Sequence, residues 1–309
     1  MSLRRRRDIW DLAVIGGGIA GLTAAWHALR RGLATTLFEA QPNCGGQVAT
    51  VNALDDWPAA GPVSGVELAA GMVAMLSPEI VDIRYEQLES VRAEDGLLRV
   101  RSASRNLRAR RVIAASGARL RTLGVKGEEA LRGKGVSQCA HCDGHFFRAQ
   151  DVVVVGGGDA ALQEALVLAE LCRSVTIVAR SRLKARAAYV ERAASKPNVR
   201  FVWGCEIDAV HGASAVTGVR LRNVKTDAKD DLPCVGVFPF VGVLPNTSYL
   251  PASVRRDSSG LVLTDARLRT AEPAIFAVGA ARAGYAGDLV SAAGEAAAAL
   301  AAIAADLES

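Results

Sequence analysis

The pattern of apolar and polar positions near the start of the chain predicts a strand, then a glycine-rich loop, then a helix. Residues 11–15 (DLAVI) form a short apolar run that predicts a buried strand, and residues 16–21 (GGGIAG) follow at once. From residue 19 to residue 31 the apolar side chains recur at helical spacing, which predicts a helix with one apolar face. Residues 35–38 (TTLF) predict the next strand, so the chain opens with a strand–helix–strand unit.

The same order returns in the second half of the chain. The second unit starts at Asp151. Residues 152–155 (VVVV) predict a buried strand, and residues 156–161 (GGGDAA) form the second glycine-rich loop. A helix is expected at 161–171 and a further strand at 175–178 (VTIV). Strands that alternate with helices are typical of parallel sheets. The repeat therefore predicts an α/β fold with two Rossmann-like units.

The remaining segments are expected to complete these two units. Residues 66–75 predict a helix, residues 80–113 alternate short strands with turns, and the charged turn 124–133 is expected to be a crossover between domains. After the second repeat we expect strands at 200–204, 216–224 and 234–240, a strand at 274–279, and a helix from about residue 290.

Length and composition limit the classes of protein to which the chain can belong. The chain has 309 residues, half of them hydrophobic and 30 of them glycine, which suffices for two domains with many tight turns. Its net charge of +5 is mild, and the run Arg4-Arg5-Arg6-Arg7 is expected to be a solvated tail. No window holds 18 unbroken apolar residues, and six cysteines without a signal peptide do not indicate a secreted disulfide scaffold. We therefore expect a cytoplasmic protein that binds neither nucleic acid nor a membrane.

The first glycine loop carries a dinucleotide-binding fingerprint. Gly16 allows the turn, Gly18 lets the backbone approach a pyrophosphate, and Gly21 lets the helix pack on the strand. The N-terminus of that helix faces the phosphates. Glu39 ends the next strand, 18 residues after Gly21, where an acid can accept hydrogen bonds from ribose hydroxyls.

The second glycine loop carries a related pattern with a different end. Gly156, Gly158 and Ala161 match G-x-G-x-x-A. Where a ribose-binding acid would end the next strand, the chain has Ala179 followed by Arg180. A missing acid beside an arginine favours a 2′-phosphate, and hence NADP(H) over NAD(H), although an arginine that only coats the surface is the alternative.

A short redox-type motif lies between the two loops. Cys139 and Cys142 are separated by two residues, a spacing that allows a small disulfide ring and often lowers a thiol pKa. Asp143 follows directly and can exchange a proton with a thiolate. Zinc is the competing interpretation, but Cys139, Cys142 and His145 lack a clear fourth ligand, and we expect no metal site. A dithiol between two dinucleotide sites indicates an electron path from nucleotide to disulfide.

The order of these motifs resembles that of the low-molecular-weight thioredoxin reductase family. The motifs are the first glycine loop, Gly45-Gly46-Gln47, Cys139 to Gly144, the second glycine loop, Pro245-Asn246-Thr247 and Phe276 to Gly279. The cysteine motif is also similar to that of the flavoprotein subunit of alkyl hydroperoxide reductase, without the N-terminal extension of that subunit. The resemblance covers nearly the whole chain, from about Ile9 to about Asp306.

This resemblance implies a homodimeric enzyme with two cofactors. The expected FAD site comprises Gly16, Gly18, Gly21, Glu39, Gly46, Gln47 and Gly279. The expected NADPH site comprises Gly156, Gly158, Ala161 and Arg180, with NADH not excluded. The implied domains are an FAD-binding domain (1–117 and 245–309) and an inserted NAD(P)H-binding domain (118–244) that carries the cysteines and rotates during turnover.

The resemblance also implies a role for each residue of the redox motif. Cys142 would lie against the flavin and form a charge-transfer thiolate, Cys139 would exchange with an external disulfide, and Asp143 would be the acid/base. The implied activity is electron transfer from NADPH through FAD and this pair to a disulfide. The partner would be thioredoxin, a thioredoxin-like protein or a small dithiol or disulfide.

The chain departs from the family pattern at several cofactor contacts. Ser181 stands where a second phosphate-binding arginine is usual, and Ala280 stands where a flavin-binding carboxylate is usual. Gly287-Asp288 replaces Arg-Gln, and Asp56 replaces Asn. Two alternatives to disulfide reduction therefore stay open: an oxygen-dependent oxidase of small dithiols, and a non-catalytic flavin or nucleotide sensor.

Overall fold

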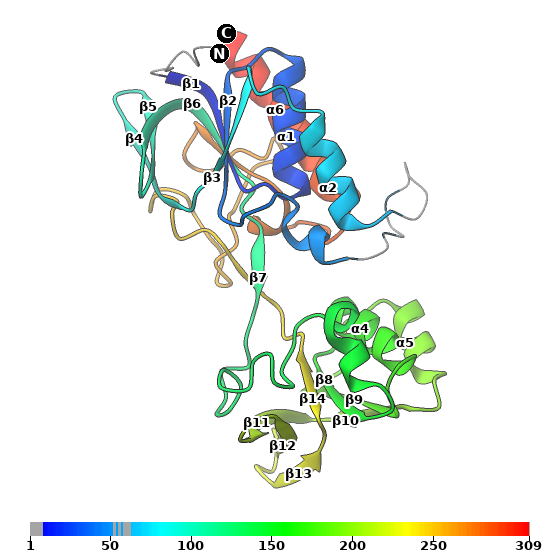
Figure 1. Cartoon of the computed structure of the whole chain (residues 1–309). Coiled ribbons are helices and arrows are strands. Elements are labelled where there is room, and N and C mark those ends of the chain that lie inside the picture. Colours follow the sequence, from blue (N-terminus) through cyan, green and yellow to red (C-terminus); the bar gives the residue numbers. More distant parts are fainter. Residues whose placement is uncertain (1–8, 52–53, 55–56, 58–62, 309) are drawn as a thin grey trace. The chain divides into compact units, whose positions relative to one another are not determined.

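The computed structural model describes residues 9–51, 54, 57 and 63–308, in two compact units (Figure 1). The first unit comprises Met1–Arg119 and Leu244–Ser309, and the second comprises Leu120–Val243. The chain leaves the first unit through β7 (Ala118–Leu120) and returns through β15 (Val243–Pro245), and these two strands pair. The second unit is thus an insertion. The arginine run at residues 4–7 and Asp56 lie outside the described residues.

A seven-stranded sheet forms the centre of the first unit. Its strands are β1 (Ile9–Ile15), β2 (Thr35–Glu39), β3 (Val81–Tyr85), β4 (Leu88–Glu94), β5 (Leu97–Ser102), β6 (Asn106–Ala114) and β16 (Ile275–Ala277). Their order across the sheet is β3-β2-β1-β6-β5-β4, and β16 also pairs with β6. The β3-β2-β1-β6 part and β16 are parallel, whereas β4 and β5 are antiparallel. The parallel part contains β1 and β2, the two strands of the predicted strand–helix–strand unit.

Both faces of this sheet are buried, which explains the continuous apolar run of β1. Leu12 and Val14 point into the core on the helical side, and Ala13 and Ile15 point into a second core on the other side. Parallel strands covered on both faces typically read as such runs. The helical side is formed by α1 (Ile19–Arg30), α2 (Gly65–Ala74) and α6 (Leu289–Glu308), with the short η1 (Gly46–Thr50) and η3 (Gly279–Ala281).

Helix α6 is long and apolar enough to cross a membrane by length and composition. It has 20 residues and a mean hydropathy of 1.5, the only such helix among the described residues. One stripe of α6 is nevertheless buried in the core of the first unit, through Ala292, Ala296, Ala299, Leu300 and Ile303. Packing in the core of the first unit therefore explains the apolar character of this stripe.

The second unit contains a four-stranded parallel sheet with helices. Its strands are β8 (Asp151–Val155), β9 (Ser174–Ala179), β10 (Val199–Trp203) and β14 (Gly236–Pro239), in the order β10-β9-β8-β14. Its helices are α3 (Ala140–Asp143), η2 (Gly144–Phe147), α4 (Asp159–Ala169) and α5 (Ala187–Ala194). Helix α4 begins two residues before the expected start. The strand–loop–helix repeat is confirmed in this unit.

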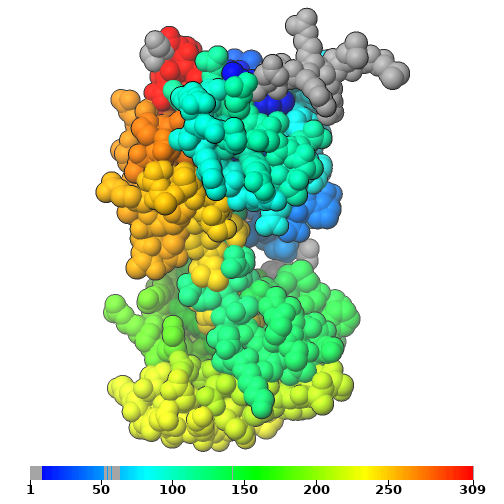
Figure 2. Space-filling model, turned by 90° about the vertical axis from the view of Figure 1, so that its left-hand side faces the viewer, coloured from blue at the N-terminus to red at the C-terminus, as the bar shows by residue number. Residues whose placement is uncertain are grey.

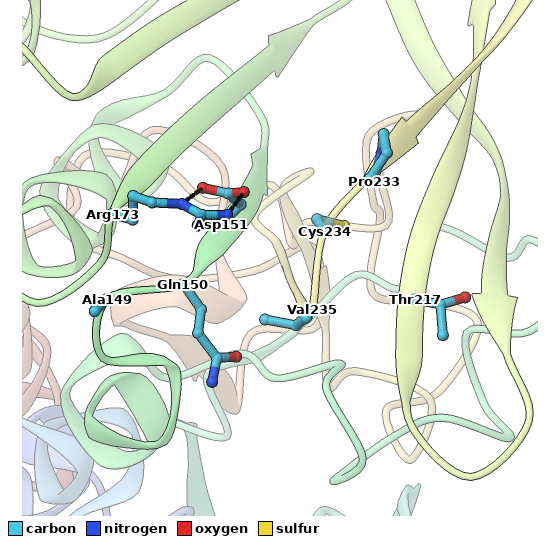
Figure 3. A pocket seen from close by; sticks show the side chains of 8 residues that line it. All are labelled: Ala149, Gln150, Asp151, Arg173, Thr217, Pro233, Cys234 and Val235. Atoms are coloured by element: carbon cyan, nitrogen blue, oxygen red, sulfur yellow. Dashed lines mark hydrogen bonds and ion pairs between the residues drawn. The ribbon is translucent and has the colours of Figure 1, made fainter.

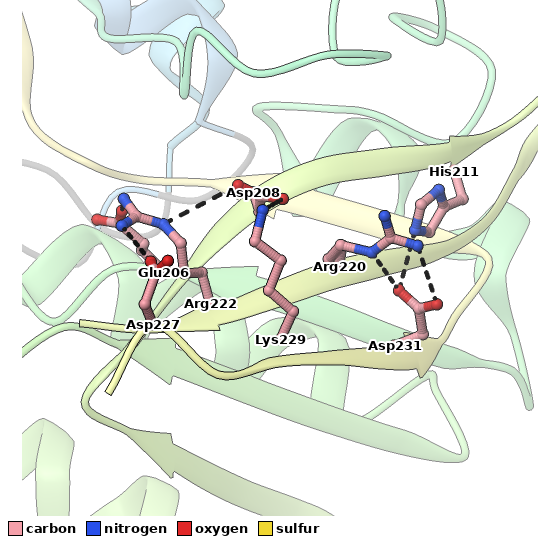
Figure 4. Close-up of polar contacts among 8 residues, drawn as sticks. All are labelled: Glu206, Asp208, His211, Arg220, Arg222, Asp227, Lys229 and Asp231. Carbon is pink, nitrogen blue, oxygen red and sulfur yellow. Dashed lines mark hydrogen bonds and ion pairs between the residues drawn. The ribbon is translucent and has the colours of Figure 1, made fainter. Parts of the chain in front are cut away.

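A small antiparallel sheet adds to the second unit, and two of its three strands were not predicted. The strands are β11 (Cys205–Gly212), β12 (Val216–Asn223) and β13 (Lys229–Pro233). Their charged side chains pair across the sheet, for example Arg220 with Asp231 at 2.9 Å and Lys229 with Asp208 at 3.0 Å (Figure 4). In the space-filling view these yellow-green residues form part of the surface of the second unit (Figure 2).

The charged turn at 124–133 is not the crossover that we expected. It belongs to the second unit, where Leu131 is buried in the core and Lys126 pairs with Ala209 of β11. Glu128, only 4% exposed, accepts hydrogen bonds from the N–H groups of Leu123 and Gly124 at 2.9 and 2.8 Å. Its charge therefore stabilises a turn inside the unit, and the chain crosses between units at β7 and β15 instead.

Candidate functional site

The first glycine loop is held by backbone contacts that leave no room for a side chain. A Cβ at Gly16 would lie 2.4 Å from the Ala115 carbonyl oxygen, and φ at Gly16 is +107°. A Cβ at Gly21 would lie 1.8 Å from the Gly16 carbonyl oxygen. Helix α1 therefore approaches β1 as closely as the fingerprint requires.

Other predicted residues of the first unit converge on the start of α1. Gly18 precedes the helix and faces open space, since its nearest neighbours to a Cβ, on Gly45 and Gly46, lie at 3.9 Å. Gly279 also lies near the start of α1. Its φ is +64°, and an added Cβ would be 3.4 Å from the Cβ of Ala20. No side chain caps α1, so its first N–H groups can donate to a phosphate. These residues fit the pyrophosphate of a dinucleotide.

Glu39 lies at the end of β2 and is only 7% exposed. One carboxylate oxygen accepts the N–H of Gly17 and the other accepts the N–H of Gln41, both at 2.7 Å. Each oxygen has a further lone pair for a ribose hydroxyl. Cys44 lies beside this carboxylate, where burial raises the pKa of its thiol, so Cys44 is not an activated thiol.

Gln47 and Gly279, which the sequence predicts to bind FAD, are held by contacts that the sequence did not reveal. The Gln47 amide donates to the Ala118 carbonyl oxygen at 2.5 Å, which fixes η1 against β7. Glu295 of α6 accepts the Gly279 N–H at 2.7 Å and pairs with Arg282 at 2.6 Å. This pair, with both side chains only 15% exposed, shapes the turn at Gly279 although Ala280 supplies no carboxylate.

Asp288, one of the departures from the family pattern, has a structural role. Its carboxylate accepts the Ser291 N–H at 2.7 Å, as an N-cap residue of α6 does. Its carbonyl oxygen accepts from the hydroxyls of Ser291 and Tyr285 at 2.9 and 2.7 Å. Asp288, which departs from the family pattern, therefore caps the N-terminus of α6.

The second glycine loop repeats the first in geometry. Gly156 has φ +143°, and its Cβ would lie 2.2 Å from the Phe240 carbonyl oxygen and 3.1 Å from the Cβ of Ala161. Ala161 is fully buried, whereas a Cβ at Gly158 would meet nothing within 4 Å. Helix α4 has no side-chain cap after Gly158. The loop therefore offers backbone donors and open space for a second pyrophosphate.

The basic residues after β9 differ in their contacts. Arg180 is exposed and follows the last residue of β9 directly. Arg186 pairs with Asp159, the first residue of α4, through its Nε at 2.6 Å and its backbone N–H at 2.7 Å. Burial raises the pKa of Asp159, but these hydrogen bonds outweigh it and keep that pKa below its ordinary value. Arg186 therefore lies at the first residue of α4, next to the second glycine loop.

Cys139 and Cys142 form a disulfide in the second unit. Their Cα atoms are 5.3 Å apart, and the Cys142 N–H donates to the Cys139 sulfur at 3.1 Å. Cys139 is half-buried at the start of the one-turn helix α3, whereas Cys142 is exposed. The structure therefore brings the two predicted cysteines together as a redox pair.

Hydrogen bonds and packing hold the turn that carries the disulfide, residues 139–143, against the rest of the second unit. Ser137 accepts the Cys139 N–H at 3.1 Å, and Glu164 of α4 accepts the Ala140 N–H at 2.5 Å. A Cβ at Gly144 would lie 3.1 Å from the Leu171 side chain, so η2 packs closely on the end of α4. Ser137 and Glu164 were not predicted as site residues, since nothing in the local pattern marks them.

Asp143 ends α3 directly after the disulfide and is half-buried. Its N–H donates to the Cys139 carbonyl oxygen at 3.1 Å, which fixes its backbone beside the pair. Phe146 follows three residues later with 70% of its surface exposed, and its ring contacts that of His145. A large exposed aromatic beside a disulfide is suited to contact with a partner.

Cys172 and Cys234 are buried cysteines that form no disulfide with another described residue. Burial raises the pKa of Cys172 to about 11 and that of Cys234 to about 12, so both thiols are protonated at neutral pH. Cys234 lines a pocket of about 260 Å³ at the start of β8 (Figure 3). Asp151 and Arg173 on its wall are paired with each other, so the pocket presents no unsatisfied charge.

Comparison with known proteins agrees with this geometry. Residues 10–301 match the family described as pyridine nucleotide-disulphide oxidoreductase. A thioredoxin reductase from Treponema pallidum is 39% identical over 276 residues, which is 89% of each chain. One subunit of the alkyl hydroperoxide reductase of Pseudomonas putida is 35% identical over 88% of this chain and 53% of its own.

The solved structures lead to the same family. The thioredoxin reductase of Lactococcus lactis superposes with a TM-score of 0.89 at 32% identity, over 96% of this chain and 98% of its own. The resemblance noted in the sequence and the two-domain Rossmann-like α/β fold are confirmed. The chain belongs to the pyridine nucleotide-disulphide oxidoreductase family.

Proposed function

We propose that this protein is a FAD-dependent enzyme that uses NADPH to reduce the disulfide of thioredoxin or a thioredoxin-like protein. The observation that carries this proposal is the Cys139–Cys142 disulfide, fixed on α3 in the unit that holds the second glycine loop. The similarity to thioredoxin reductases over 89% of the chain supports this partner. The same similarity does not favour a dithiol oxidase or a sensor.

Each cofactor is assigned to one unit. FAD is proposed to bind the first unit through Gly16, Gly18, Gly21, Glu39, Gly46, Gln47 and Gly279. NADPH is proposed to bind the second unit through Gly156, Gly158, Ala161 and Arg180. When bound, FAD takes two electrons from NADPH and makes them available to the disulfide. We further propose that the enzyme is a cytoplasmic homodimer, as the resemblance implies.

The two sulfurs perform the exchange with the partner. In the reduced pair, the Cys139 thiolate attacks one sulfur of the partner disulfide, and the other partner sulfur leaves as a thiolate. The Cys142 thiolate then attacks the Cys139 sulfur of this mixed disulfide, which releases the second partner thiolate and restores the Cys139–Cys142 bond. Two electrons pass to the partner, and Asp143 is placed to supply a proton to a leaving thiolate. The exposed ring of Phe146 provides an apolar contact for the partner.

Single cysteine variants test the proposal. Cys139→Ser and Cys142→Ser should each lose NADPH-dependent thioredoxin reduction while the fold is kept, because one sulfur cannot complete the exchange. Cys142→Ser should still form a mixed disulfide with the partner through Cys139, seen by non-reducing gel and mass spectrometry. Cys205→Ser, which changes a half-buried cysteine away from the motif, should keep activity. Normal turnover by Cys139→Ser would show that the electrons follow another path.

A further inference from the structure

The ring of Tyr85 lies at the end of the parallel strands that carry the proposed FAD site. Tyr85 is the last residue of β3, and 51% of its surface is exposed. Strand β3 runs parallel to β2, and their register places Tyr85 directly opposite Glu39, the residue proposed to bind ribose. Because the side chains of directly paired residues leave a sheet on the same face, the ring and the carboxylate are neighbours at the carboxyl ends of the strands. Open α/β sheets bind their ligands at these ends.

Cys44 connects this ring with the first glycine loop. Its sulfur lies 4.0 Å from the hydroxyl oxygen of Tyr85, and a Cβ at Gly17 would lie 2.7 Å from the same sulfur. That Cβ would also lie 3.0 Å from a carboxylate oxygen of Glu39. The Gly45 N–H donates to the Gly17 carbonyl oxygen at 2.8 Å, which fixes the segment that carries Cys44 on the glycine loop. The tyrosine ring, the thiol and the carboxylate therefore form one cluster beside the loop.

The order of the strands gives the direction in which the adenosine half of a bound FAD extends. In the order β3-β2-β1, strand β1 leads through the glycine loop into α1, whose uncapped N–H groups fit the pyrophosphate, and β2 ends at Glu39. Adenosine diphosphate runs from phosphates to ribose to adenine, and neighbouring strands are about 4.8 Å apart. The step from pyrophosphate to ribose crosses from β1 to β2. One further step in the same direction reaches the end of β3 and the ring of Tyr85.

We propose that Tyr85 contacts the adenine of FAD with its exposed ring, and that Cys44 positions this ring through the tyrosine hydroxyl. An aromatic side chain can stack on a base because every base has a flat π-face. The inference deepens the proposed function and rests on it, since it assigns to one side chain of this protein the end of the cofactor that Glu39 and the glycine loop leave uncovered.

Binding of FAD to the apoprotein tests the contact, with flavin fluorescence as the readout and without NADPH or a partner protein. Tyr85→Ala should weaken FAD binding about tenfold, within the range that stacking of a base on an aromatic ring supplies. Tyr85→Phe keeps the ring and should weaken binding by no more than about threefold, because it removes one weak contact to sulfur. Trp203→Ala removes an equally exposed ring, also 51%, from β10 of the second unit and should leave FAD binding unchanged.

Two further measurements separate this contact from an effect on the fold. Thermal unfolding of the apoprotein, followed by circular dichroism, should be the same for Tyr85→Ala and the original protein, because the ring is exposed. Alkylation of Cys44 by N-ethylmaleimide is read from the mass of its peptide. With FAD at ten times its dissociation constant this alkylation should be about tenfold slower, because only about one tenth of the protein is then free. Cys205, a half-buried cysteine of the second unit, should react at the same rate with and without FAD.

The possible results distinguish the contact from the proposed function. Equal FAD affinity of Tyr85→Ala and the original protein, or a Cys44 that FAD does not protect, would refute the contact. A loss of affinity that comes with a loss of apoprotein stability would assign Tyr85 to the fold and refute the contact as well. An original apoprotein that binds no FAD would instead contradict the proposed function.

Discussion

A methyl group at Gly21 should separate α1 from β1 and weaken both the fold and flavin binding. A Cβ there would lie 1.8 Å from the Gly16 carbonyl oxygen, and real Cβ contacts essentially never fall below 3.0 Å. The first turn of α1 must therefore move by on the order of 1 Å against a packed sheet. Overpacking of this kind costs about 1–3 kcal/mol. The same shift displaces the N–H groups that are proposed to bind the pyrophosphate of FAD.

Gly71 provides a matched control for this substitution. It lies in the last part of α2, it is exposed, and an added Cβ would meet nothing within 4 Å. Gly71→Ala should therefore stabilise the protein by about 0.5–1 kcal/mol, through the higher helix propensity of alanine. The same chemical change is thus expected to act with opposite sign in two helices of one unit.

Urea unfolding followed by circular dichroism gives the free energy of unfolding of both variants, and absorbance after release gives their FAD content. We expect Gly21→Ala to unfold at lower urea and to purify with less FAD, and Gly71→Ala to unfold at higher urea with full FAD content. If Gly21→Ala kept the stability and FAD content of the original protein, the close contact between α1 and β1 would not govern this site.

Two further changes test single carboxylates. Asp143→Asn should keep the fold and FAD but slow thioredoxin reduction by roughly 10²–10⁴-fold, the usual contribution of general acid/base catalysis; an unchanged steady-state rate would remove Asp143 from the mechanism. Hydrogen bonds from Arg173 and Ser174 lower the pKa of Asp151 from 3.8 to about 2, so its stabilising contribution is present above pH 4 and is lost as the pH falls toward 2. Asp151→Asn should therefore make the urea midpoint less dependent on pH in that interval, and because the pair is partly exposed the effect should stay below about 1 kcal/mol; a slope equal to that of the original protein would contradict the assignment.

The features that the sequence predicted well depend on short-range rules. The glycine loops could be placed because Gly16 and Gly156 each follow an apolar strand directly and take a φ that other residues rarely adopt. Glu39 could be placed because the spacing of strand, helix and strand brings it beside Gly17. In each case a single strand–loop–helix–strand segment determines the geometry.

The features that were missed depend on partners far away in the chain. Strands β11 and β13 carry charges where a buried strand would carry apolar residues, and the pairing of Arg220 with Asp231 is visible only once the strands are side by side. Glu164 reaches a backbone group 24 residues away, and a glutamate in a helix is usually solvated. Pattern and propensity carry no information about such contacts.

The insertion of the second unit also affects how the chain is made on the ribosome. The first unit is completed only by its last segments, because β16 pairs with β6 and α6 packs against α1. The inserted unit is entirely translated before these segments emerge, so it can fold while the first unit still lacks a helix over one face of its sheet. Apolar surface around Leu22 and Ala25 then lacks its cover until α6 has emerged. The order of synthesis therefore makes the first unit complete its fold after the unit that is inserted into it.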